Sequence, residues 1–203
     1  IRYYEEKVEA ARNFANKIWN ASRFVMMNLD KDLMEKYKDC KEYTLADKWI
    51  LSRINTVVKE ATENIDKFEL GIAAQKIYDF MWNEFCDWYI ELVKPALYGD
   101  DEKAKGVVLN VLNEVLKKGL KLLHPVMPFI TEEIYTNLPN TEETIVTSTW
   151  PVFEEELSDA KTEEQMNYII EAIKSLRNVR SEMNVPPSRK AKIGRASCRE
   201  RVS

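Results

Sequence analysis

The chain has 203 residues, of which 32% are charged and 45% hydrophobic, and its formal net charge is −4 at pH 7. This composition supplies enough apolar surface for a buried core, which excludes an intrinsically disordered chain, and the charged residues interrupt every apolar run that could form a transmembrane helix. Only five glycines and seven prolines are present, so the sequence favours long helices over many short strands.

Apolar residues recur at helical spacing from the start of the chain. The first helix is expected over residues 5–29, and a polar loop should follow over residues 30–43. Thr44 and Asp47 have the N-cap and N3 positions of a capping box. A second helix should therefore begin there and run to about residue 65.

A third helix is expected over residues 69–94 and is apolar around most of its circumference, which is typical of a helix in the middle of a bundle. Pro95 and Gly99 should end it. The segment Phe80–Tyr89 is rich in aromatic residues. Aromatic residues at helical spacing are far more often core than a cofactor pocket, so we interpret this segment as core packing.

Three further helices are predicted. One begins after Asp101, whose charge suits a helix start, and the others cover residues 128–138 and 159–182. The β-branched residues 144–147 predict an extended segment between the last two helices. The fold class is therefore predicted to be all-α, a helical bundle followed by a C-terminal extended segment and an additional helix.

The sequence predicts three parts. We expect a helical bundle over residues 1–139, and then an extended linker, a helix and the start of a truncated small unit over residues 140–192. Residues 193–203 change abruptly to an Arg, Ser and Gly bias and resemble a translated sequencing adapter, so we interpret them as a non-native tail. Without that tail the net charge is −6, because it holds three arginines and one glutamate. Ile1 in place of Met suggests that the N-terminus is a cut.

The residue types required for common catalytic and metal centres are scarce. His124 is the single histidine, and Cys40 and Cys86 are isolated, so neither a zinc site nor a Cys/His nucleophile pair is predicted. His124 precedes Pro125 at a helix end, where it suits a structural role. Lone thiols are typical of a reducing compartment, which favours the cytoplasm. Two acidic pairs are interpreted as helix-start charges: Asp100 with Asp101, and Glu132 with Glu133.

The first helix has a polar stripe that packing does not explain. Asn13, Lys17, Asn20 and Phe24 are spaced 4, 3 and 4 residues apart, opposite the apolar face, and Arg23 flanks the stripe. An aromatic ring for stacking, amides for base edges and cations for phosphate are the groups that recognise single-stranded RNA. Alternatively, Phe24 packs against a loop or another helix of a larger protein.

A second row of basic residues lies on the last predicted helix and beyond it. This row either follows an RNA backbone or is a solvated helix face. Its members are Lys174, Arg177, Arg180, Arg189, Lys190 and Lys192.

Four stretches of the sequence are similar to one enzyme family, the valyl-tRNA synthetases. These stretches are residues 7–24, 84–91, 123–133 and 180–188. The first and third also resemble leucyl and isoleucyl synthetases, whereas the second and fourth are more specific to the valyl family. Together the similarity spans about residues 5–192.

The resemblance implies the helical anticodon-binding domain of a class I aminoacyl-tRNA synthetase, an enzyme that joins valine to its tRNA using ATP and magnesium. The implied partners are the valine-specific tRNA and a catalytic domain of the same longer chain. No catalytic residue, cofactor, metal or membrane contact is expected within these 203 residues. The family contacts the anticodon from its first helix, which this sequence matches at Lys17 and Phe24.

Two other functions remain open from the sequence. The chain could be a free-standing RNA-binding bundle that works without a catalytic core. It could also be a protein-interaction module whose Phe24 stripe binds another protein.

Overall fold

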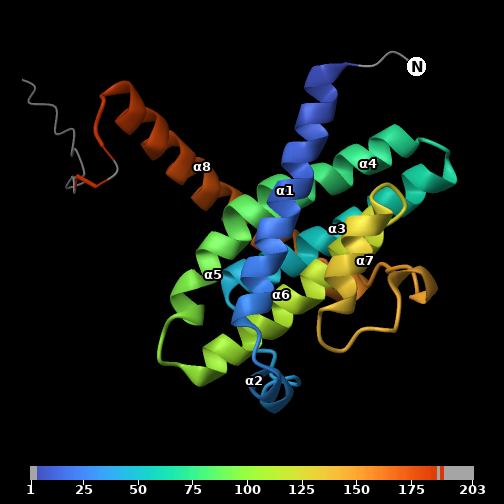
Figure 1. Cartoon of the computed structure of the whole chain (residues 1–203). Coiled ribbons are helices and arrows are strands. Elements are labelled where there is room, and N and C mark those ends of the chain that lie inside the picture. The colour runs from blue at the N-terminus through green and yellow to red at the C-terminus, as the bar shows by residue number, and fades with distance from the viewer. Residues whose placement is uncertain (1–3, 187, 190–203) are drawn as a thin grey trace, which may run out of the picture. The chain divides into compact units, whose positions relative to one another are not determined.

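The computed structural model describes residues 4–186 and 188–189, and these fall into two compact units, Ile1–Met166 and Asn167–Ser203. All regular structure in the described residues is helical (Figure 1), which confirms the all-α prediction. Within the same residues, none of the helices combines the length and apolarity needed to cross a lipid bilayer. The predicted tail 193–203 lies outside the described residues, and the predicted three-part division stays a prediction.

The first unit is built from helices that follow one another with short connections. α4, the π-helix η1 and α5 are continuous and form one long helix. The elements in order are α1 (Glu5–Asn28), α2 (Lys31–Lys36), α3 (Leu45–Asp66), α4 (Leu70–Asp79), η1 (Phe80–Tyr89), α5 (Ile90–Leu97), α6 (Glu102–Leu123), α7 (Pro128–Thr136), the short 3₁₀ helices η2 (Ile145–Thr147) and η3 (Glu155–Leu157), and the start of α8 (Ala160–Glu182).

Predicted capping residues begin two of these helices. The Thr44 backbone N–H donates to Asp47 Oδ2 at 2.9 Å, and the Asp47 N–H donates back to Thr44 Oγ1 at 3.2 Å, which confirms the capping box of α3. Asp101 Oδ1 accepts hydrogen bonds from the N–H groups of Lys103 and Ala104 and caps α6. Both carboxylates therefore satisfy N–H groups that have no partner inside the helix.

The structure corrects three local predictions. Residues 30–43 are not all loop, because Asp30 accepts a hydrogen bond from the Leu33 N–H and caps the short helix α2. Pro95 does not end the third predicted helix, which continues to Leu97, since a proline in the last turn removes only one intrahelical hydrogen bond. The β-branched residues 144–147 form a 3₁₀ turn capped by Thr144 instead of an extended segment.

The core confirms that the aromatic segment is packing, but its backbone was not predicted. Phe80, Met81, Phe85 and Tyr89 are buried in η1, whose π-helical winding has no signature in the apolar pattern. η1 packs on α1 and α3, and Met81 contacts Gly119 of α6 so closely that a side chain there would collide with it. The aromatic middle of the long helix therefore contacts α6 on one face and α1 on another.

The second unit begins within α8 at Asn167. Its helix ends in a turn where Asn184 has a positive φ of 51° and the Val185 N–H donates to the Arg180 carbonyl at 2.8 Å. Arg180 also donates to the carbonyls of Pro186 and Arg189. Arg180, a member of the predicted basic row, thus stabilises the turn that follows α8 through these hydrogen bonds.

Candidate nucleic-acid interface

One side of α1 is fixed to the long helix by aromatic packing. Phe14, Ile18 and Val25 are buried, and the Phe14 ring lies 4.5 Å from the Tyr78 ring and 6.2 Å from the Trp82 ring, measured between centroids. Residues 5–13 of α1 are all exposed, and in Figure 1 the first turns of the helix extend past α4. The packed turns of α1 therefore lie beyond residue 13, where three of the four stripe residues also lie, namely Lys17, Asn20 and Phe24.

An open groove with a volume of about 510 Å³ runs between α1 and the helix formed by η1 and α5. All four residues of the predicted polar stripe line it, which brings them together on one surface, whereas Arg23 is exposed and outside the lining. The opposite wall comes from residues far away in the sequence. The lining residues are Asn13, Asn16, Lys17, Asn20, Ala21, Phe24, Cys86, Ile90, Glu91 and Lys94.

Lys17 is held inside the groove by two contacts. Its Nζ lies 2.6 Å from Asp87 Oδ1 and 3.7 Å from the centroid of the Trp82 ring. Only 23% of the Lys17 side chain is exposed. The ammonium group is therefore an oriented part of the groove wall, and its charge is largely balanced by Asp87.

The sequence left open whether Phe24 is exposed for base stacking or packed against another segment, and its burial in the structure is intermediate. The side chain is half-buried, so it is neither core nor fully solvated. Lys94 Nζ lies 5.6 Å from the centroid of the Phe24 ring, and the same ammonium group contacts Glu91 Oε1 at 2.5 Å. The ring is thus open to the groove and is approached there by one cation.

The thiol of Cys86 adds an apolar patch to the groove. Burial raises the pKa of Cys86 to about 12, although the positive charge of Lys17 acts in the opposite direction. The thiol therefore stays protonated near neutral pH and is a poor nucleophile. This environment favours binding and not covalent chemistry.

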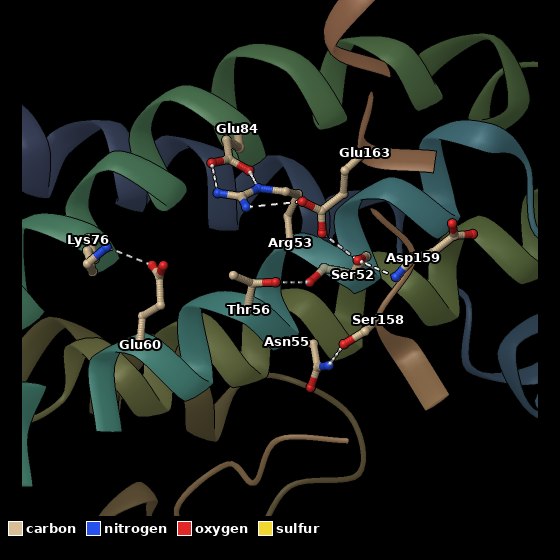
Figure 2. Close-up of polar contacts among 10 residues, drawn as sticks. All are labelled: Ser52, Arg53, Asn55, Thr56, Glu60, Lys76, Glu84, Ser158, Asp159 and Glu163. Atoms are coloured by element: carbon tan, nitrogen blue, oxygen red, sulfur yellow. Dashed lines mark hydrogen bonds and ion pairs between the residues drawn. The ribbon is translucent and has the colours of Figure 1, made fainter. Parts of the chain in front are cut away.

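Arg53 anchors η1 from the side of α3, as Figure 2 shows. Its guanidinium group donates two hydrogen bonds to the Glu84 carboxylate, at 2.7 and 2.9 Å, and a third at 3.3 Å to Glu163. Ser52 donates to Glu163 at 2.5 Å and accepts from the Asp159 N–H at 2.9 Å. These contacts tie η1, α3 and the first turn of α8 together, so the helix that carries Asp87 cannot slide freely along α3.

Two of the remaining candidate residues, His124 and Lys174, have partners within the protein. His124 Nδ1 lies 2.8 Å from Thr131 Oγ1, which links the end of α6 to α7. Lys174 pairs with Glu171 at 3.0 Å on the exposed side of α8. Lys190 and Lys192 lie outside the described residues. Among the residues that the structure describes, no group of three or more His, Cys, Asp or Glu side chains could hold a metal ion.

Sequence reasoning missed the second wall of the groove. Its lining residues Glu91 and Lys94, and Asp87 beside them, lie seventy or more residues after Lys17 in the sequence. A helical wheel of α1 cannot reveal which residues of another helix face it. A partial signal existed, because the stretch 84–91 was one of the two most specific to the valyl family. That similarity marked the segment without indicating that it faces the polar stripe.

Comparison with known proteins places the chain in a class. Residues 47–194 match the family described as the anticodon-binding domain of tRNA ligase. The chain belongs to this family, and the region matched includes η1, α5 and all but the first two residues of α3, the helices that form and support one wall of the groove.

The particular relatives are valine–tRNA ligases. Those of Clostridium tetani and Clostridium perfringens are each 72% identical to this chain over 193 residues, and that of Bacillus anthracis is 46% identical. Each match covers 95% of this chain but only 22% of the relative. The chain therefore corresponds to the anticodon-binding region of a valine–tRNA ligase, as its resemblance indicated, and spans about a fifth of the length of these relatives.

Proposed function

We propose that this region recognises the anticodon loop of valine-specific tRNA, and that the groove beside α1 holds an unpaired nucleotide of that loop. The observation that carries the proposal is the half-buried Phe24 ring, which lines an open groove together with amide side chains. Recognition of RNA sequence generally uses unpaired bases that stack on aromatic rings and hydrogen-bond along their edges.

Each predicted residue has a role in this proposal. Phe24 stacks on a base, while Asn13 and Asn20 offer amide donors and acceptors to base edges. Lys17 provides a fixed positive charge beside the base, and the exposed Arg23 contacts the phosphate backbone. Helix α1 can present all these groups to one strand of RNA because they lie within about three turns of the helix.

For the longer protein, we propose the activity that the names of the relatives state, the ligation of valine to its tRNA. ATP and magnesium would serve that reaction in a catalytic domain of the same longer chain, in the cytoplasm. In this proposal the region contributes recognition of the tRNA, and the catalytic residues belong to that other domain. Support for the proposal comes from the identity of 72% to a relative with that name.

The test is a comparison of two RNAs that differ in the anticodon loop alone. The affinity of the chain is measured by electrophoretic mobility shift and by fluorescence anisotropy for a valine-specific tRNA transcript and for the same transcript with a substituted anticodon. We expect the substituted transcript to bind at least about tenfold more weakly, since loss of one good base contact costs roughly 1–3 kcal/mol. Equal affinity for the two transcripts would contradict anticodon recognition, and no binding to either would favour the protein-interaction alternative.

A further inference from the structure

Both lysines that line the groove already have carboxylate partners: Glu91, also a lining residue, pairs with Lys94, and Asp87, outside the lining, pairs with Lys17. Lys17 contacts Asp87 at 2.6 Å and Lys94 contacts Glu91 at 2.5 Å, so two positive charges face two negative ones. RNA affinity depends on cations that neutralise phosphates. A lysine of this groove can neutralise a phosphate when it exchanges its carboxylate partner for that phosphate.

The two lysines differ in how firmly they are held. Lys17 is 23% exposed and has a cation–π contact at 3.7 Å in addition to its ion pair. Lys94 is 37% exposed, its partner Glu91 is 60% exposed, and its ammonium group lies 5.6 Å from the Phe24 ring. Exposed ion pairs one helical turn apart contribute little to stability, so Lys94 can change partner at small cost.

The position of Lys94 over the Phe24 ring links the exchange of Glu91 for a phosphate to base stacking. Its ammonium group lies over the ring of Phe24, and both residues line the groove, so a base that stacks on this face takes the space that the ammonium group occupies. A stacked base also brings its own backbone phosphate to the same end of the groove. The displaced ammonium group then has an anionic partner within reach of its flexible side chain.

We propose that Lys94 covers the Phe24 ring in the free protein, tethered by Glu91, and becomes a phosphate ligand when an RNA base stacks on that ring. This inference rests on the proposed function, because it requires that the groove binds RNA. It adds a residue of α5 to the interface and gives Glu91 a role as the carboxylate that the phosphate replaces.

The experiment measures the affinity of the 203-residue chain for the valine-specific tRNA transcript at several salt concentrations. The variants are Lys94→Ala, Glu91→Gln and, as a matched control, Lys76→Ala. Lys76 suits this purpose because it pairs with Glu60 at 2.8 Å and is 36% exposed, close to the 37% of Lys94 (Figure 2). Circular dichroism confirms that each variant keeps its helical content.

We expect Lys94→Ala to weaken binding several-fold at low salt and to lower the slope of log affinity against log salt by about 0.7–1, the value for one phosphate contact. Glu91→Gln should strengthen binding several-fold, since it removes the competing carboxylate. Lys76→Ala should bind within twofold of the unchanged chain. Unchanged or tighter binding by Lys94→Ala, with an unaltered salt slope, would show that Lys94 contacts no phosphate and would overturn the inference.

A fourth variant, Phe24→Ala, separates failure of this inference from failure of the proposed function. Weaker binding by Phe24→Ala together with an unaltered salt slope for Lys94→Ala overturns only the role of Lys94. Unchanged binding by both variants overturns the stacking surface itself, and the inference with it.

Discussion

Tyr89 joins the aromatic middle of the long helix to the start of α3. Its hydroxyl donates at 2.7 Å to Asp47 Oδ1, and both side chains are buried. Burial and the neighbouring negative charge of Asp47 raise the pKa of Tyr89 well above its ordinary value, so the hydroxyl remains a donor. The other oxygen of Asp47 serves the capping box, so one carboxylate links a helix start to the core.

We predict that Tyr89→Phe destabilises the fold by roughly 1–3 kcal/mol, because a buried carboxylate oxygen loses its donor without any change in packing volume. Urea unfolding followed by circular dichroism measures this difference. Tyr98→Phe serves as a control, since Tyr98 is 67% exposed. An equal stability of Tyr89→Phe and the unchanged chain would show that water replaces the lost hydrogen bond.

Lys17 tests the electrostatic part of the groove. We predict that Lys17→Ala weakens binding of the valine-specific tRNA less than Phe24→Ala does, and that the loss shrinks as salt is added. Part of the loss comes from freeing the carboxylate of Asp87 to repel phosphate. Lys103→Ala is a suitable control because Lys103 pairs with Glu42 elsewhere on the unit. A loss that does not depend on salt would count against a charge effect.

The polar stripe shows what a sequence can reveal at this scale. Four groove residues could be found because they belong to one helix, where spacing alone decides which side chains share a face. The degree of burial of Phe24 and the pairing of Lys17 with Asp87 could not be found. Both depend on a second helix whose rotation is set by core packing.

Among whole elements, the long helix of α4, η1 and α5 supplies the second wall of the groove through η1 and α5, and Arg53 holds η1 in place. The side chains of Arg53, Glu84 and Glu163 are 27%, 22% and 21% exposed, so they are shielded from solvent more than an ordinary surface ion pair. Hydrogen bonds to Glu84 raise the pKa of the Arg53 guanidinium further above its already high ordinary value. The Arg53 guanidinium therefore stays charged at neutral pH.

We predict that Arg53→Leu costs roughly 1–3 kcal/mol of unfolding free energy, because it leaves two partly buried carboxylates without their donor. The matched control is Lys76→Leu, which breaks the more exposed pair with Glu60 and should cost at most about 1 kcal/mol. Chemical unfolding of both variants measures the difference. Equal costs would mean that the Arg53 contacts are worth no more than a surface pair.

The start of α8 predicts a dependence on pH. Hydrogen bonds from the Thr162 hydroxyl and N–H lower the pKa of Asp159. Because the pKa is lower in the folded state than in the unfolded chain, the stabilisation is present above about pH 4 and is lost as the pH falls through the folded value. We expect the stability difference between the unchanged chain and Asp159→Asn to shrink below about pH 4. A difference that stays constant down to pH 2 would contradict this linkage.

Helix boundaries with capping residues could be predicted, whereas unusual winding could not. Thr44 and Asp101 mark the starts of α3 and α6, because only a few residue types have side chains that accept hydrogen bonds from the free backbone N–H groups of a first helical turn. The π-helical winding of η1 and the 3₁₀ turn at Ile145 leave no distinctive pattern of apolar residues in the sequence. The short helix α2 was missed because six residues carry too little periodicity to stand out.

At the scale of the whole molecule, the first unit places the polar stripe of α1 beside the long helix. The first unit buries the apolar faces of α3 and α6 and leaves the stripe of α1 at an open groove. The all-α class and the family could both be predicted from the sequence. The groove required the structure, since its two walls come from α1 and from the long helix.

The most direct measurement compares two phenylalanine substitutions in tRNA binding. Phe24 lies in the groove, whereas Phe129 at the start of α7 is 90% exposed and is not a lining residue of the groove. Phe24→Ala should weaken binding of the valine-specific tRNA transcript by about one to two orders of magnitude, the loss of roughly 1–3 kcal/mol of stacking, while Phe129→Ala should bind within twofold of the unchanged chain. Binding by a folded Phe24→Ala variant that equals the unchanged chain, or that falls no further than Phe129→Ala, would contradict base stacking in this groove.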